Sequence, residues 1–314
     1  MNDILSIMSA EERAAFSLCA IYEGAGYKKY RMSKFEEYAL YVQNKDFLVS
    51  ESVITFTDTD GKLLALKPDV TLSIIKNTRA QDGVMKVYYK ENVYRVSKGT
   101  RSFKELMQAG LECLGDVTTD TVIEVLALAA KSLDVISAEN VLEISHLDIV
   151  SGVLDALKIS EEGKREILLH LGEKNVSGVR AAAEREGVAA DKLSLVEKLV
   201  TVYGAPSAVL PSLDAFALTP ELCAATAELR EIVKGLSDMG LSERLIIDFS
   251  VVNDMNYYNG IAFKGFVRGI PVGILSGGEY DGLLRKMQKN EKGIGFAVYL
   301  DEISRLGEAK GATE

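Results

Sequence analysis

Two segments of the chain carry polar side chains whose types and spacing suit a small, positively charged ligand. Asp69-Val70-Thr71 places a carboxylate and a hydroxyl at an expected helix start, where either group could instead cap the helix by accepting an amide hydrogen bond. In an expected strand from Leu106 to Leu114, side-chain alternation puts Gln108, Gly110 and Glu112 on one face. The glycine leaves room there for a ligand, although the same face could be the solvated side of an antiparallel sheet.

Three further groups could join such a site. Arg95 lies in an expected strand among tyrosines, where it could bind a carboxylate or phosphate through two hydrogen bonds or form a structural ion pair. Tyr257-Tyr258-Asn259-Gly260 precedes another strand, and Ser276-Gly277-Gly278 lets the backbone approach a neighbour closely beside Tyr280 and Asp281. Acids, hydroxyls, an amide and tyrosines that converge would suit a small zwitterion with an ammonium group and a polar ring.

The elements that must position these groups mix antiparallel strands with helices and do not repeat a βαβ unit, which predicts an α+β fold. A capping-box pattern from Ser9 to Glu12 predicts a helix ending near Gly24. Asp60-Gly61 predicts a tight hairpin turn, because glycine adopts positive φ without strain. The other expected strands cover 53–57, 63–66, 84–90, 92–97, 106–114, 141–144, 244–250, 261–267 and 271–275. The other expected helices cover 69–76, 118–136 and 148–157, a segment ending near 288, and a last helix entered from 293–298.

Between residues 160 and 240 the character of the chain changes. This stretch is rich in Ala, Glu, Lys and Leu, and glycines and prolines interrupt its helical pattern. We therefore expect residues 1–159 and 241–314 to form one domain that carries a helical insertion subdomain at 160–240.

Composition narrows the function further. Of the 314 residues, 36 are Lys or Arg and 46 are Asp or Glu, a net charge of −10 that disfavours nucleic-acid binding. The N-terminus lacks a signal-peptide pattern, and no run of about 18 apolar residues occurs, so we expect a cytoplasmic protein without a membrane span. Three cysteines and two histidines form no zinc-binding spacing, so we expect no metal and no cofactor.

Read in order, four segments resemble the catalytic domain of histidyl-tRNA synthetase, a class II aminoacyl-tRNA synthetase fold with an antiparallel sheet flanked by helices. The resemblance covers nearly the whole chain outside the helical insertion, and four ordered motifs are far more specific than one. The segments are Leu66-Lys67-Pro68-Asp69-Val70-Thr71, Tyr94-Arg95 through the basic loop Lys98-Gly99-Thr100-Arg101 to Gln108-Ala109-Gly110-Leu111-Glu112, Met255-Asn256-Tyr257-Tyr258-Asn259-Gly260 with Gly277-Gly278-Glu279-Tyr280-Asp281-Gly282, and Gly295-Phe296-Ala297-Val298-Tyr299-Leu300-Asp301-Glu302-Ile303.

The resemblance implies which residues would bind histidine. The family's histidine-binding positions fall on Asp69, Thr71, Gln108, Glu112, Tyr258 and Tyr280. The arginine that binds the α-phosphate in the synthetase corresponds to Arg95, which is therefore a possible anion- or carboxylate-binding residue.

Three departures from the synthetase pattern imply that adenylation is lost. Where the synthetase has arginines that hold ATP or assist adenylate formation, this chain has Asn253, Glu279 and Glu302. Adenylyl transfer depends on positive charge placed where negative charge develops, and losing one such donor costs roughly 10²–10³ in rate. We also expect the chain to lack the synthetase's C-terminal anticodon-binding domain and to bind no tRNA.

A histidine pocket without adenylation chemistry resembles the family of ATP phosphoribosyltransferase regulatory subunits, the synthetase paralogues in histidine biosynthesis. Membership implies no catalytic residues, assembly with a short catalytic subunit into a hetero-octamer, and feedback inhibition by L-histidine; a homodimer of this chain is also expected. Two alternatives stay open at this point. One is a stand-alone class II ligase that activates histidine or another amino acid, and the other is an RNA-binding module derived from a synthetase.

Overall fold

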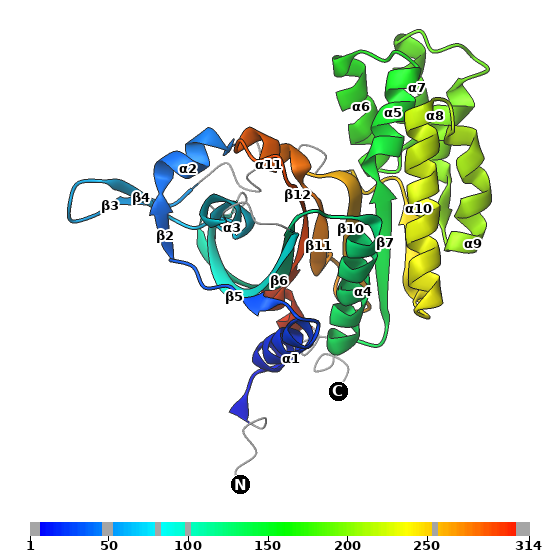
Figure 1. The fold of residues 1–314 in the computed structure, drawn as a ribbon. Helices are drawn as coiled ribbons and strands as arrows, with labels where there is room; N and C mark the ends of the chain where they lie inside the picture. The colour runs from blue at the N-terminus through cyan, green and yellow to red at the C-terminus, as the bar shows by residue number, and fades with distance from the viewer. Residues whose placement is uncertain (1–6, 46–52, 79–82, 98–101, 253–256, 306–314) are drawn as a thin grey trace.

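The computed structural model describes residues 7–45, 53–78, 83–97, 102–252 and 257–305, and shows a curved sheet with helices on both faces (Figure 1). Within these ranges the larger sheet has nine strands. In spatial order they are β1 (Lys28–Lys29), β5 (Val84–Val96), β6 (Phe103–Gly115), β12 (Lys292–Tyr299), β11 (Leu275–Glu279), β10 (Asn259–Val267), β7 (Asn140–His146), β9 (Leu245–Asp248) and β8 (Tyr203–Gly204). Neighbours pair antiparallel except β1 with β5 and β7 with β9, so the predicted α+β class with a mainly antiparallel sheet is confirmed.

A smaller sheet projects from the opposite side of the molecule to the helical segment (Figure 1). Its strands are β2 (Phe35–Glu37), β4 (Leu63–Leu66) and β3 (Thr55–Thr57). The predicted turn between β3 and β4 is confirmed, because Gly61 has a φ of +81°, a conformation that favours glycine.

The helices form largely where the sequence predicts them. They are α1 (Ala10–Gly24), α2 (Tyr38–Gln43), α3 (Thr71–Asn77), α4 (Thr119–Ile136), α5 (Leu147–Ala156), α6 (Glu161–Gly172), α7 (Val176–Arg185), α8 (Leu193–Thr201), α9 (Pro206–Val209), α10 (Pro220–Asp238) and α11 (Asp281–Lys286), with 3-10 helices η3 (Leu210–Phe216), η4 (Ser242–Arg244) and η5 (Leu300–Ile303). The capping box of α1 is confirmed: Ser9 Oγ accepts from the Glu12 amide at 3.2 Å, and Ser9 N donates to the Glu12 carboxylate at 2.9 Å. In the part of the chain that the structure describes, none of the helices combines the length and the apolar character needed to cross a bilayer.

The predicted break between residues 90 and 92 is wrong. Strand β5 runs without interruption and pairs with β6 from Val84 opposite Gly115 to Val96 opposite Phe103. Glu91 stays in the strand because its carboxylate lies 2.5 Å from Lys67 Nζ, and the Lys67 side chain is fully buried. A buried ammonium requires an acceptor, so this ion pair holds the middle of β5 in place.

One strand prediction near the C-terminus is also wrong. The strand expected at 271–275 is β11, which begins at Leu275 and contains both glycines of the Gly277-Gly278 pair. A Cβ atom on Gly277 would overlap the Gly295 carbonyl of the next strand, so this glycine permits close packing within the sheet rather than a turn. Residues 292–299 form strand β12, which leads, as expected, into helical turns: the 3-10 helix η5 and then residues 304–305, the last that the structure describes.

The two faces of the larger sheet bury separate cores. On the face that carries Leu111, called here the Leu111 face, residues such as Phe263 and Phe296 pack in the main core with α1, α4, α5 and α10. On the opposite face, called here the Glu112 face, Val87 and Tyr89 pack in a smaller core with residues of α2, α3 and α11. The side chains predicted to bind a ligand lie beside this smaller core.

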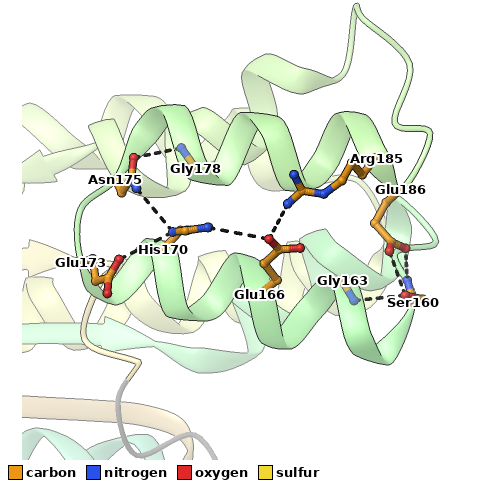
Figure 2. A network of polar contacts seen from close by, with 9 residues as sticks. All are labelled: Ser160, Gly163, Glu166, His170, Glu173, Asn175, Gly178, Arg185 and Glu186. Atoms are coloured by element: carbon orange, nitrogen blue, oxygen red, sulfur yellow. Dashed lines mark hydrogen bonds and ion pairs between the residues drawn. The ribbon is translucent and has the colours of Figure 1, made fainter.

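Residues 160–240 form helices α6 to α10 at one side of the sheet (Figure 1). Figure 2 shows how α6 and α7 are joined: Ser160 and Asn175 cap them, Glu186 accepts from the Ser160 hydroxyl at 3.0 Å, and Arg185 pairs with Glu166. The range is not purely helical, because β8 lies within it and pairs with β9. Its apolar residues also belong to the main core, so the division into a domain and an insertion stays a prediction.

One ion pair between a half-exposed lysine and a buried carboxylate joins this helical segment to the sheet. Lys174, between α6 and α7, places Nζ 2.5 Å from Asp248 Oδ2 in β9 and 4.6 Å from the ring centre of Tyr203. Only 2% of the Asp248 side chain is exposed, so its carboxylate depends on Lys174 for compensation.

Candidate functional site

Glu112 lies at the centre of a buried cluster on the Glu112 face. Its Oε1 accepts a hydrogen bond from Thr71 Oγ1 at 2.6 Å, and its Oε2 accepts one from the Tyr280 hydroxyl at 2.5 Å. Helix α3 supplies the threonine, and the tyrosine lies between β11 and α11. Glu112 is 2% exposed and Gln108 is 3% exposed, so the alternative of a solvated sheet face is wrong.

A glycine of the neighbouring strand leaves space for the Glu112 side chain. A Cβ atom on Gly295 would overlap the Glu112 carboxylate, so β12 makes room for that carboxylate. The room expected above Gly110 is not free: a Cβ atom there would lie 2.5 Å from the hydroxyl of Tyr89, which faces Gly110 across β5 and β6. The prediction that Gly110 leaves space for a ligand is therefore corrected, because this tyrosine fills the space.

Asp69 both caps a helix and contributes charge to the site. Its Oδ1 accepts from the Leu72 amide at 2.9 Å near the start of α3, as the capping interpretation predicted. Burial raises the pKa of Asp69, while the Leu72 amide and the Arg95 guanidinium oppose that rise. Arg95 itself donates from Nε to the Pro68 carbonyl at 3.1 Å. Arg95 therefore supports the loop before α3 and favours the charged form of Asp69.

Three tyrosines pack together beside the Glu112 carboxylate. The rings of Tyr257 and Tyr258 meet edge to face at 4.8 Å, and those of Tyr257 and Tyr280 lie 6.2 Å apart. Burial raises the pKa of Tyr257 well above its usual value, and a hydrogen bond with Thr71 opposes that rise. The ring of Tyr258 covers β11, since a Cβ atom on Gly278 would lie 2.8 Å from its Cδ1.

The histidine-binding positions that the resemblance implies leave out two members of this cluster, Tyr257 and Tyr89. A signal for Tyr257 was present, because it adjoins Tyr258 in the same motif. A signal for Tyr89 was absent, because its place depends on the register that sets it opposite Gly110. Both phenols have pKa values raised by burial and by nearby Glu112.

The carboxyl group of Glu112 has a higher pKa than an exposed glutamate. Burial raises its pKa to about 8, against the opposing effect of the Thr71 and Tyr280 hydroxyls, and nearby Asp69 raises it further. A cationic group placed beside this carboxyl would favour its ionised form. Acceptor oxygens surrounded by aromatic rings therefore suit an ammonium or imidazolium group.

Gln108 lies on the same face of β6 as Glu112 but further along the strand. Four residues of strand separate the two Cα atoms by about 13 Å. Gln108 pairs in register with Tyr299 of β12 and Glu91 of β5. It therefore lies on the Glu112 face but apart from the hydrogen bonds that join Thr71, Glu112 and Tyr280.

The three departures from the synthetase pattern do not all face the site. Asn253 lies outside the described residues, as do Lys98–Arg101 of the basic loop and the Met255-Asn256 part of the third motif. Glu279 is on the Leu111 face, where its Oε2 accepts from the Ile261 amide at 2.7 Å. Glu302 in η5 pairs with Arg305 at 2.9 Å. These contacts place neither carboxylate in the cluster around Glu112.

The strand order and the polar cluster on one face of the sheet define a protein of the class II aminoacyl-tRNA synthetase fold. Its sequence matches the profile of the histidyl-tRNA synthetase family over residues 4–303. The chain therefore belongs to that family.

Similar proteins extend the comparison. Proteins named ATP phosphoribosyltransferase regulatory subunit include one from Acetivibrio thermocellus, 26% identical over 90% of this chain and 69% of its own length. Another, from Caldanaerobacter subterraneus, is 29% identical over 90% of this chain and 75% of its own length. A crystal structure from Bacillus halodurans, described as an ATP phosphoribosyltransferase regulatory subunit/histidyl-tRNA synthetase, superposes with a TM-score of 0.83 at 25% identity and covers 95% of this chain and 79% of that one.

A chain of the ATP phosphoribosyltransferase complex from Thermotoga maritima shares the fold. It superposes with a TM-score of 0.72 at 20% identity, over 92% of this chain and 97% of that one.

Proposed function

We propose that the chain is a regulatory subunit of ATP phosphoribosyltransferase and has no catalytic activity of its own. The observation that carries the proposal is that relatives of this name match about 90% of the chain. The proposed place of the protein is therefore the first step of histidine biosynthesis, where it supports the short catalytic subunit.

The proposed ligand is L-histidine, bound at the cluster around Glu112. Support comes from the chemistry of the cluster: a buried carboxyl held by Thr71 and Tyr280, with Asp69 nearby, offers acceptors for an ammonium and an imidazole. Tyr258 and Gln108 would complete the orientation of the ligand. Histidine would inhibit by binding one arrangement of the complex more tightly than another, since a ligand shifts an equilibrium only by its differential affinity.

The proposed partner is the short catalytic subunit of ATP phosphoribosyltransferase, in a hetero-octamer that contains homodimers of this chain. Support comes from the names of the relatives and from the fold shared with a chain of the Thermotoga maritima complex. We further propose that the chain binds no tRNA, in keeping with its net charge of −10.

Co-purification with the short catalytic subunit tests the proposal. We expect a stable complex by size-exclusion chromatography, phosphoribosyl transfer that depends on this chain, and inhibition by L-histidine. In the complex, Glu112→Gln is expected to weaken inhibition, and the matched variant Glu162→Gln, at an exposed carboxylate of α6, to leave it unchanged. Failure to form a complex, or a complex whose activity ignores both this chain and histidine, would overturn the proposal.

The class II ligase alternative makes a different prediction. A ligase would catalyse ATP–pyrophosphate exchange that depends on histidine or another amino acid. For a regulatory subunit we expect exchange at the background rate with every amino acid tested, and amino-acid-dependent exchange would favour the ligase.

A further inference from the structure

Strand β10 contains a bulge directly before the ligand site. Asn259 lies opposite Glu279 of β11, but Ala262 lies opposite the adjacent Gly278, so β10 has two additional residues, Gly260 and Ile261. A bulge of this kind removes backbone groups from the regular ladder and leaves them in need of other partners.

A side chain of the neighbouring strand completes this bulge. The Ile261 amide donates to Glu279 Oε2 at 2.7 Å. Gly260 has a φ of +53°, and a Cβ atom there would overlap the same carboxylate oxygen. Glycine thus meets two requirements at this position, the left-handed backbone and the space for Glu279. The Gly260 amide is also in reach of Asp148 Oδ1, at 3.4 Å.

The surroundings of Glu279 do not favour a charge. Glu279 is 7% exposed, and burial raises its pKa to about 7. Glu228 and Asp281 raise this pKa further, whereas Lys292 and the Ile261 amide lower it. Burying a carboxyl group near other acids costs free energy, and the hydrogen bonds that the group makes offset part of that cost. The hydrogen bond that Glu279 accepts from the Ile261 amide is therefore its main contribution to the structure.

The bulge is directly connected to the tyrosines of the site. Tyr257 and Tyr258 immediately precede the first bulge-flanking residue, and Tyr280 follows Glu279 in the chain. The ring of Tyr258 packs on Gly278, beside Glu279 on the same strand. Any movement of the bulge would therefore move one or both sides of this tyrosine cluster.

We propose that Glu279 is a positioning residue for the tyrosine cluster: by accepting the Ile261 amide, it fixes the bulge that sets Tyr257 and Tyr258 against Tyr280. The inference rests on the proposed function only for the identity of the ligand. Glu279, which stands where the synthetase has an arginine, therefore has a structural role in this chain. Its side chain shapes the ligand site from the opposite face of the sheet.

Two measurements on three variants test this role. Hydrogen exchange of the peptide 257–262 in the ligand-free protein reports the Ile261 amide, and titration calorimetry reports the Kd of L-histidine. We expect Glu279→Ala to lose protection in this peptide and to raise the Kd about tenfold. Glu279→Gln retains a carbonyl acceptor, so we expect native protection and a Kd within about twofold of the native value. Asp248→Ala removes a different buried carboxylate, in β9, that accepts the Ser250 amide, and is expected to change neither readout.

Several results would overturn the role. Native protection of 257–262 in Glu279→Ala would do so, as would equal damage in Glu279→Gln, because the charge and not the acceptor would then be decisive. If native protein binds no histidine while Glu279→Ala loses protection, the positioning role stands and the proposed ligand fails. If Glu279→Ala does not fold, Gly260→Ala displaces the same carboxylate and is measured by the same two assays, with the same outcomes expected.

Discussion

Replacing Glu112 by glutamine is expected to change ligand binding and folding in opposite directions. The carboxylate would make charge-assisted hydrogen bonds to a cationic ligand, each worth about 1.5–3 kcal/mol. Glutamine is nearly the same size but carries no charge, so the Kd of L-histidine is expected to rise about 10- to 150-fold. The free energy of unfolding of the ligand-free protein is expected to increase, because a buried ionisable group is removed.

The stability change has a defined pH dependence. Burial raises the pKa of Glu112 from 4.5 to about 8, so between these pH values the folded protein holds a proton that the unfolded chain releases. The contribution of this group to stability is therefore complete below pH 4.5 and is lost as the pH rises toward 8. At about 1.4 kcal/mol per pKa unit, the loss reaches at most about 5 kcal/mol. Glutamine does not titrate, so the advantage of the variant grows across this range.

Urea denaturation from pH 5 to 8.5 and calorimetry with L-histidine measure the two effects. The control is Glu162→Gln, which alters an exposed carboxylate of α6 and is expected to change neither. The ligand-binding role of Glu112 is refuted if Glu112→Gln binds histidine within threefold of the native protein. It is also refuted if the stability difference between the two proteins does not grow with pH.

Three further substitutions test other parts of the structure. Tyr280→Phe removes the hydroxyl that donates to Glu112; we expect a Kd for L-histidine about five- to tenfold higher in calorimetry, with an unchanged circular dichroism spectrum. Gly110→Ala forces a methyl group against a buried tyrosine and the next strand, and is expected to lower the free energy of unfolding in urea by about 1–3 kcal/mol. Lys174→Ala leaves the buried Asp248 carboxylate without its cation; we expect a similar loss of stability and an unchanged histidine Kd, and native stability would show that this pair is dispensable.

Local sequence signals predicted the parts of the fold that depend on a few neighbouring residues. The capping box at Ser9 and the turn at Gly61 form as predicted, because each is set by the conformational preference or hydrogen bonds of adjacent residues. The shared face of Gln108, Gly110 and Glu112 follows in the same way from the two-residue period of a strand.

The parts that the sequence did not predict depend on register between strands. Tyr89 fills the space above Gly110 because β5 and β6 pair in one particular alignment, and neither strand alone specifies that alignment. The Gly277-Gly278 pair indicated a close backbone approach, which is confirmed, but the strands and the ring that approach it are visible only once β11 lies between β10 and β12. Glu91 remained in β5 because distant Lys67 pairs with it.

The direction of a side chain also changes what a substituted residue means. In the sequence, Glu279 and Glu302 stand at positions where the synthetase has arginines. In the structure, Glu279 faces the main core and accepts the Ile261 amide, and Glu302 pairs with Arg305, so neither carboxylate belongs to the cluster around Glu112. The proposed loss of adenylation rests on the missing positive charge. A buried cluster that keeps its acids without those cations fits the proposed role, in which the protein holds a cationic amino acid and leaves it unreacted.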